Sequence, residues 1–191
     1  MDKLQKIKSA VKRSRFVYRE IDLSLKKLFD ENHVTSEISC KRGCSFCCHT
    51  QVSVTCDEAE LFAEKVIKGH KIDFFRLYIQ SQAGNNSEKW YLLPYEMRKC
   101  VFLNDNDECS IYDDRPSVCR TNYVFSIPFS CSTQDGLEKS VRLLLTKEAD
   151  MIIMAANLNS NENGVLPYLL NKVLNKTKQP EGLRSGDKAY F

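Results

Sequence analysis

The chain has 191 residues, of which 42% are hydrophobic and 28% are charged, so it can bury a core, and disorder over its whole length is excluded. No apolar run approaches the roughly 20 residues that a membrane-spanning helix needs. The net charge of +3, from 28 basic and 25 acidic residues, is too small to indicate a nucleic-acid partner.

Residues 1–31 are predicted to form one amphipathic helix. Its apolar side chains recur at three- and four-residue spacing: Leu4, Ile7, Val11, Tyr18, Ile21, Leu25 and Leu28. The polar face is basic, and we expect it to face solvent while the apolar stripe packs on the core. A coiled-coil partner and an anionic surface remain alternatives. The first eight residues lack the apolar segment of a signal peptide, so we expect a cytoplasmic protein.

The segment 39–50 is polar and rich in cysteine, which predicts an irregular loop. Thr55 and Glu58 fit a capping box, in which each side chain accepts a hydrogen bond from the backbone of the other, so a helix is expected to begin there. A second helix is predicted over 71–82, followed by a turn at 83–87.

A second cysteine region runs from Cys100 to Cys131 and is followed by helices predicted over 137–158 and 165–175. The fold class is therefore predicted as mainly α, a single small domain of helices around a loop-rich cysteine cluster. We expect an N-terminal amphipathic helix at 1–31, a cysteine-cluster metal-binding domain at 32–175 and a flexible tail at 176–191.

The nine cysteines point to metal chemistry, because thiols in a reducing compartment seldom form a disulfide framework. They fall into a tight run and a looser one: Cys40, Cys44, Cys47 and Cys48, then Cys100, Cys109, Cys119 and Cys131. Four thiolates complete a zinc site or hold one iron–sulfur cluster, so eight can build two centres or one polynuclear centre.

The adjacent pair Cys47 and Cys48 raises a geometric question, since neighbouring side chains point in different directions. We expect one of them to serve a second metal, to bridge or to stay free, with a disulfide between the two as the alternative. Gly43 permits a sharp turn between the first ligands, and the N–H groups of its neighbours can point at sulfur.

The spacing Cys40-x3-Cys44-x2-Cys47 also occurs in radical SAM enzymes. Those enzymes resemble partial or full (β/α) barrels, and this chain has neither the strand–helix alternation nor the length. The radical SAM alternative is therefore disfavoured.

The ordered set of motifs is more specific than any one spacing. The CxxCxxCC-like run at 40–48 is followed by Val52-Ser53-Val54-Thr55, then by Cys100-Val101-Phe102-Leu103, Cys109-Ser110-Ile111-Tyr112 and Arg115-Pro116-Ser117-Val118-Cys119-Arg120. This set resembles the CxxCxxCC family of zinc- or iron-chelating proteins, also called YkgJ-type cysteine cluster proteins, over about residues 40–131. One branch of that family is similar to flagellin lysine N-methylases.

The resemblance implies eight metal ligands: Cys40, Cys44, Cys47, Cys48, Cys100, Cys109, Cys119 and Cys131. No strong motif surrounds Cys131. Cys56 is left over and is expected to be a small buried hydrophobic side chain. Val101 departs from the family pattern, which commonly has proline at this position.

Three further side chains are candidates near the cysteines. Arg115 and Arg120 flank Cys119, where guanidinium groups would offset the negative charge of clustered thiolates. His49 follows the cysteine pair and is a minor candidate ligand. The sequence assigns no catalytic residue.

The leading hypothesis is a cytosolic metal-binding protein that holds an iron–sulfur cluster or zinc, with a redox or electron-transfer role if the metal is iron. The alternatives are a flagellin lysine N-methylase-like protein methyltransferase, for which no glycine-rich SAM loop is visible, and a zinc-stapled interaction module. The expected partner is an unidentified protein or redox partner; we expect no membrane span, and nucleic acid is disfavoured.

Overall fold

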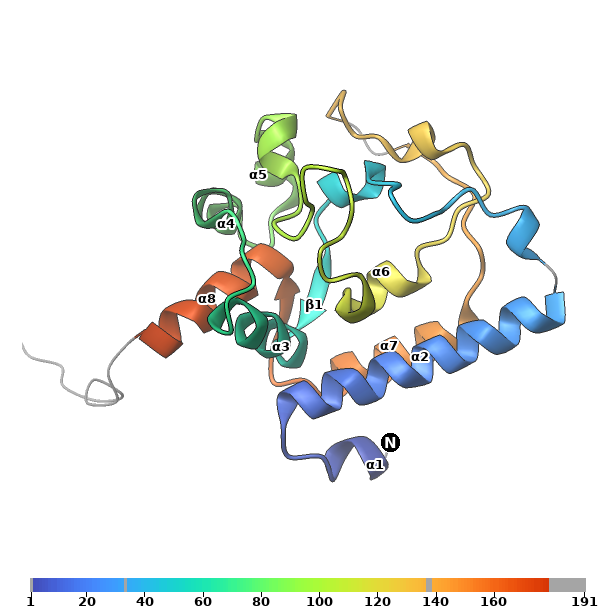
Figure 1. Cartoon of the computed structure of the whole chain (residues 1–191), viewed down its shortest axis with the longest axis horizontal. Helices are drawn as coiled ribbons and strands as arrows, with labels where there is room; N and C mark the ends of the chain where they lie inside the picture. The colour runs from blue at the N-terminus through green and yellow to red at the C-terminus, as the bar shows by residue number, and fades with distance from the viewer. Residues whose placement is uncertain (1, 33, 137–138, 179–191) are drawn as a thin grey trace, which may run out of the picture.

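The computed structural model describes residues 2–32, 34–136 and 139–178. Residues 176–178 of the expected tail are the end of a helix, and the rest of that tail lies outside the described residues. It is mainly α, as predicted (Figure 1). The helices are α1 (Asp2–Gln5), α2 (Ala10–Asn32), α3 (Cys56–Ile67), α4 (Phe74–Gln82), α5 (Ser87–Tyr91), α6 (Ser117–Thr121), α7 (Lys147–Asn159) and α8 (Leu166–Lys178). Two short strands, β1 (Ser53–Thr55) and β2 (Asn163–Val165), pair antiparallel.

The predicted N-terminal helix is broken into α1 and α2 at residues 6–9. Ser9 Oγ accepts a hydrogen bond from the N–H of Lys12 at 3.4 Å, as an N-cap residue does, so a new helix begins after it. Arg13 Nη1 donates to the carbonyls of Ile7 and Lys8, both at 2.9 Å, which stabilises the non-helical turn.

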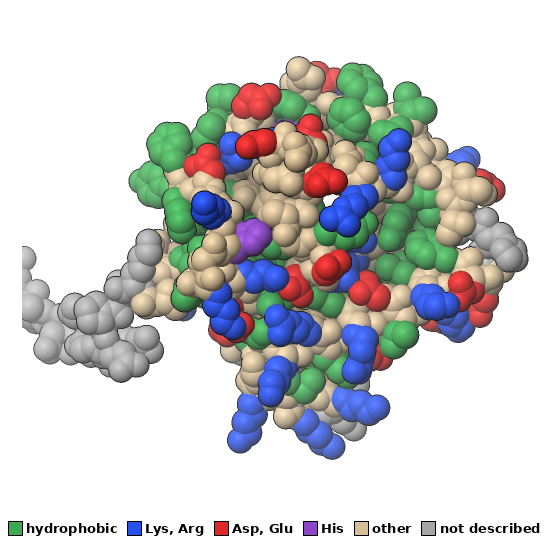
Figure 2. Space-filling model, viewed as in Figure 1, with side chains coloured by type: hydrophobic (Ala, Val, Ile, Leu, Met, Phe, Trp, Pro, Cys, Tyr) green, Lys and Arg blue, Asp and Glu red, His purple; other side chains and the backbone are tan. Residues whose placement is uncertain are grey.

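The apolar stripe of α2 is buried as predicted. Val17, Ile21 and Leu25 pack with Ala149 of α7, and α7 lies beside α2 in Figure 1. The lysines of the polar face are exposed, and Figure 2 shows basic side chains gathered over α1 and the start of α2. None of the described helices is both long and apolar enough to cross a bilayer.

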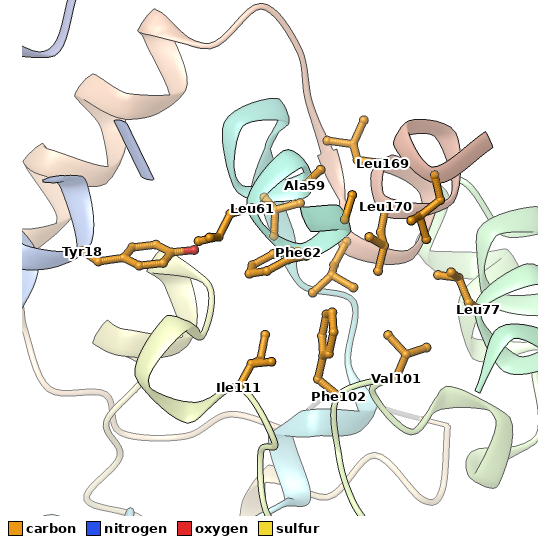
Figure 3. Close-up of a cluster of buried hydrophobic side chains, with 14 residues drawn as sticks. Tyr18, Ala59, Leu61, Phe62, Leu77, Val101, Phe102, Ile111, Leu169 and Leu170 are labelled. Carbon is orange, nitrogen blue, oxygen red and sulfur yellow. The ribbon is translucent and has the colours of Figure 1, made fainter. Parts of the chain in front are cut away.

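The larger core lies between α3, α4 and α8. Phe62 of α3 packs 5.5 Å from the ring of Phe102, and Val101 and Ile111 enter the same cluster from the cysteine-rich region (Figure 3). Val101 and Phe102 are the two residues that follow Cys100, and Ile111 lies two residues after Cys109. The core therefore anchors the backbone that carries two of the predicted ligands.

The predicted helix over 137–158 begins only at Lys147. Before it, the chain is extended and pairs with the cysteine region: Leu144 donates its N–H to the carbonyl of Tyr123, and Phe125 donates to that of Arg142, both at 2.8 Å. This long-range pairing keeps the chain around Arg142 and Leu144 extended, although the sequence pattern there is helical. Residues 137–138 lie outside the described chain.

Glu58 joins three helices through one buried carboxylate. The predicted capping box with Thr55 is confirmed, since Oε2 accepts from the Thr55 N–H at 2.8 Å and Thr55 Oγ1 accepts from the Glu58 N–H at 3.2 Å. Oε1 also accepts from the Tyr18 hydroxyl at 3.1 Å and from the Ser117 N–H at 2.7 Å. This carboxylate therefore links α2, α3 and the start of α6, the helix that carries Cys119.

Replacing Glu58 by Ala should lower the free energy of unfolding by about 3 kcal/mol, because it leaves several buried donors without an acceptor. Urea denaturation measures the change. Glu60→Ala, an exposed carboxylate in the same helix, is the control and should change stability by less than about 0.5 kcal/mol. Equal effects of the two substitutions would contradict this role of Glu58.

Candidate metal centre

The first cysteine run is a tight loop that ends in a single helical turn. The N–H of Cys44 donates to the carbonyl of Lys41 at 3.0 Å, and Gly43 adopts φ +84°, which a residue with a Cβ rarely does. Cys47 and Cys48 lie on the 3₁₀ turn η2 (Phe46–His49). The sharp turn expected at Gly43 is confirmed.

The second run is a hairpin followed by a short helix. A β-bridge joins Leu103 to Cys109, and Asn104 Oδ1 accepts from the N–H groups of Asn106 and Glu108, both at 2.9 Å, which closes the loop between them. Cys119 lies in the first turn of α6, whose N–H at Ser117 is bound by Glu58.

Backbone contacts bring the two runs together. Cys100 donates its N–H to the carbonyl of Cys48 at 2.8 Å. The Cys40 sulfur lies 3.3 Å from the N–H of Val124, which donates to it, and 3.6 Å from the carbonyl of Asn122. Residues far apart in the sequence thus surround the same loop.

Cys131 enters on the 3₁₀ turn η5 (Pro128–Cys131), which contacts η2. The ring of Phe129 meets that of Phe46 edge-on at 5.9 Å. Arg98 also fixes this segment, since its Nη1 and Nη2 donate to Thr133 Oγ1 at 3.1 Å and to the Thr133 carbonyl at 2.8 Å. Nothing in the local sequence signals this clamp, because Arg98 and Thr133 are distant along the chain.

Backbone amides point at three of the sulfurs in the same way. The backbone amide two residues further on lowers the thiol pKa of Cys44 (amide of Phe46), of Cys100 (amide of Phe102) and of Cys109 (amide of Ile111). Such N–H donors stabilise a thiolate and belong to the outer shell of sulfur-ligated metals. Phe102 and Ile111 are buried in the core, so the same residues anchor the loop and orient its donors.

Burial is the main cause of the raised pKa at six of the eight candidate ligands, and neighbouring thiols add to it at five of these, all but Cys109. Burial raises the pKa of Cys40, of Cys131 (to about 11), of Cys100 (to about 12) and of Cys119. The thiols that raise the pKa differ from one cysteine to another. They sort the sulfurs into two sets of neighbours, which meet at Cys47.

In the first neighbourhood, Cys40, Cys44 and Cys131 each have Cys47 as a sulfur neighbour. In the second, Cys48 has Cys100 and Cys119 as neighbours, and these two also lie near Cys109. We call them the first thiol group (Cys40, Cys44, Cys47, Cys131) and the second thiol group (Cys48, Cys100, Cys109, Cys119). Cys47 also acts on Cys100 and Cys119, so it lies where the groups meet.

The adjacent pair forms the junction. The Cys48 thiol donates a hydrogen bond to the Cys47 sulfur, which lowers the pKa of Cys47 to about 7 and raises that of Cys48. All nine cysteines are free thiols. The structure therefore has no disulfide between Cys47 and Cys48, which was the alternative.

Cys56 is apart from both groups. Burial raises its pKa, and the charges acting on it are those of Glu60, Asp57, Glu162 and Lys176 rather than other thiols. It is the first residue of α3 and is half-buried rather than fully enclosed, which is more exposed than we expected.

Within residues 2–32, 34–136 and 139–178, no three Cys, His, Asp or Glu side chains are arranged so that they could hold a metal ion. The thiols share a region without forming a closed ligand set, so binding requires their side chains to turn toward a common centre. The donors themselves fit zinc or iron: thiols in fours, amides aimed at sulfur and a nearby guanidinium.

The two arginines that flank Cys119 have different roles. The charge of Arg115 opposes the effect of burial on the thiol pKa of Cys40, Cys109 and Cys119, as predicted. Arg120 has no such effect there. It binds both oxygens of Asp22 at 2.7 and 2.8 Å and lies over the ring of Tyr18, so it ties α6 to α2. The prediction that Arg120 offsets thiolate charge is therefore not supported.

His49 is buried and stacks on the ring of Tyr95, with centroids 4.1 Å apart. Its backbone carbonyl accepts from Trp90 Nε1 at 3.0 Å. Its Nδ1 has no hydrogen-bond partner among the described residues. These contacts account for His49 as a packed side chain beside the cysteine pair.

The model of one protein family matches residues 39–141, more than half of the chain. This is the CxxCxxCC family, described as a putative zinc- or iron-chelating domain. No curated protein and no solved structure matches the chain. The matched segment begins just before Cys40 and includes both thiol groups, and on this match the chain belongs to the CxxCxxCC family of zinc- or iron-chelating domains.

Proposed function

We propose that this protein holds iron, as an iron–sulfur cluster, or zinc through Cys40, Cys44, Cys47, Cys48, Cys100, Cys109, Cys119 and Cys131. One observation carries the proposal: thiols from two distant runs gather in one region while the ninth cysteine, Cys56, lies elsewhere. Clustered buried thiols cost stability if they ionise without a cation, and a bound metal removes that cost.

The two thiol groups support two centres with four sulfurs each. Four thiolates complete a tetrahedral zinc site or hold one iron–sulfur cluster. Cys47 and Cys48 lie on one turn and share Cys100 and Cys119 as sulfur neighbours, but only Cys47 acts on Cys40, Cys44 and Cys131. The pair would then mark the boundary between the centres.

Sulfur-only ligand sets serve both metals, so the choice rests on the spacing of the ligands. Compact zinc modules use short, regular loops, whereas eight to eleven residues separate the cysteines of the second run. This favours iron–sulfur, and with it a role in electron transfer or redox sensing. With zinc, the metal would stabilise the fold, and the protein would act through its surface.

Anaerobic purification tests the choice of metal. We expect a brown protein whose visible absorption is accompanied by iron and acid-labile sulfide. A colourless protein with stoichiometric zinc would instead support the structural role. A protein free of both metals after expression in supplemented medium would contradict the proposal as a whole.

Cys44→Ser and Cys119→Ser should each lose bound metal and lower the melting temperature of the loaded protein, because ligation and folding are linked. Elemental analysis and thermal denaturation measure the two effects. Cys56→Ala is the matched control and should keep its full metal content. Loss of metal in the control, or full retention in both serine variants, would show the ligand assignment to be wrong.

The same variants test the division into two centres. Each single variant should lose roughly half of the metal, since each damages one four-sulfur group, and the double variant should lose nearly all of it. If either single substitution removes all of the metal, the sulfurs enclose one polynuclear centre instead.

A further inference from the structure

Among the described residues, Arg115 keeps its charge without an ion pair. Its Nε is buried and has no hydrogen-bond partner, and no carboxylate of the described residues lies within ion-pair distance of its guanidinium. Arg120, five residues on, shows the contrast, since its three nitrogens donate to Asp22 and to the carbonyls of Asp113 and Arg115.

The orientation of Arg115 is fixed from several sides. Its guanidinium lies over the ring of Tyr112, 4.1 Å from the centroid, and Nη2 is 3.5 Å from the Tyr123 hydroxyl, to which it donates. Pro116 restricts the backbone that follows. Burial disfavours the charged form of the guanidinium, but its contacts with Tyr112 and Tyr123 favour that form, so the pKa of Arg115 is raised without a carboxylate partner among the described residues.

The two tyrosines that hold the Arg115 side chain adjoin both thiol groups. Tyr123, which Arg115 contacts, lies between the two residues whose backbone touches the Cys40 sulfur. Tyr112, on which Arg115 stacks, donates its N–H to the carbonyl of Cys109 at 3.2 Å.

Four thiolates around a divalent metal carry excess negative charge, which a buried site must offset. We propose that Arg115 is the counter-cation of the metal centre, a positioning residue whose free Nε–H and charge are kept for the ligand thiolates of both groups. This inference rests on the proposed function, because it gives Arg115 no role unless the thiols bind metal.

Cobalt(II) titration of the metal-free protein tests the inference, because thiolate-bound cobalt absorbs visibly and competition with a chelator gives its affinity. Arg115→Gln should weaken cobalt binding by about 10- to 100-fold, the usual cost of losing an outer-shell partner. Arg115→Lys should recover part of that loss, because the charge remains. The metal-free form of Arg115→Gln should have a urea midpoint only slightly below that of the metal-free wild type, because it loses the stacking on Tyr112 and the hydrogen bond to Tyr123 but no ion pair.

Arg42→Gln is the matched control. Arg42 lies over the same Tyr112 ring at 5.4 Å, but its side chain is 69% exposed, so its removal should change cobalt affinity by less than about twofold. Equal affinities of Arg115→Gln and Arg42→Gln would overturn the inference. So would equal losses in the Gln and Lys variants, because packing on Tyr112 would then be the cause. Absence of the cobalt–thiolate absorption in the wild type would instead refute the proposed function, and the inference with it.

Discussion

The hydrogen bond from the Cys100 amide to the Cys48 carbonyl joins two stretches of chain that are otherwise about fifty residues apart. The approach of the first cysteine run to the second depends on this backbone contact. It lies between an irregular loop, which has little core of its own, and a hairpin anchored by Val101, Phe102 and Ile111. The helical core thus supports the loop indirectly, through the hairpin.

Charge explains why such an arrangement suits a metal. Thiols that are buried together resist ionisation, because neither water nor a counter-ion stabilises the thiolate. The amides of Phe46, Phe102 and Ile111 and the guanidinium of Arg115 all favour the ionised form, yet burial outweighs them at Cys44, Cys100 and Cys109. A cation that binds several sulfurs would supply the missing stabilisation. The neutral contacts of Arg115 are consistent with a charge held for that state.

Local signals in the sequence were sufficient for several elements. The Thr55–Glu58 capping box fixes the start of α3, and the spacing of Tyr18, Ile21 and Leu25 identifies the buried face of α2. Long-range contacts were not predictable in this way. Glu58 also binds Tyr18 and Ser117, and the chain before α7 pairs with Tyr123 and Phe125. The Ser9 N-cap was a local signal that the long apolar stripe obscured.

The candidate site shows the same division. The motifs single out eight cysteines and exclude Cys56, and the surroundings of Cys56 agree with that exclusion. The different roles of Arg115 and Arg120 could not be inferred from sequence, because the partner of Arg120, Asp22, lies on a distant helix. The arrangement of the sulfurs into two groups could not be inferred from sequence either, because it depends on how η2 contacts η5 and the hairpin.

X-ray absorption at the edge of the bound metal is the most direct test, because it reports which atoms surround the ion in the folded protein. Sulfur alone should occupy the first shell, with about four sulfurs per metal and, for zinc, distances of about 2.3 Å. A first shell made mainly of nitrogen or oxygen donors would contradict the account.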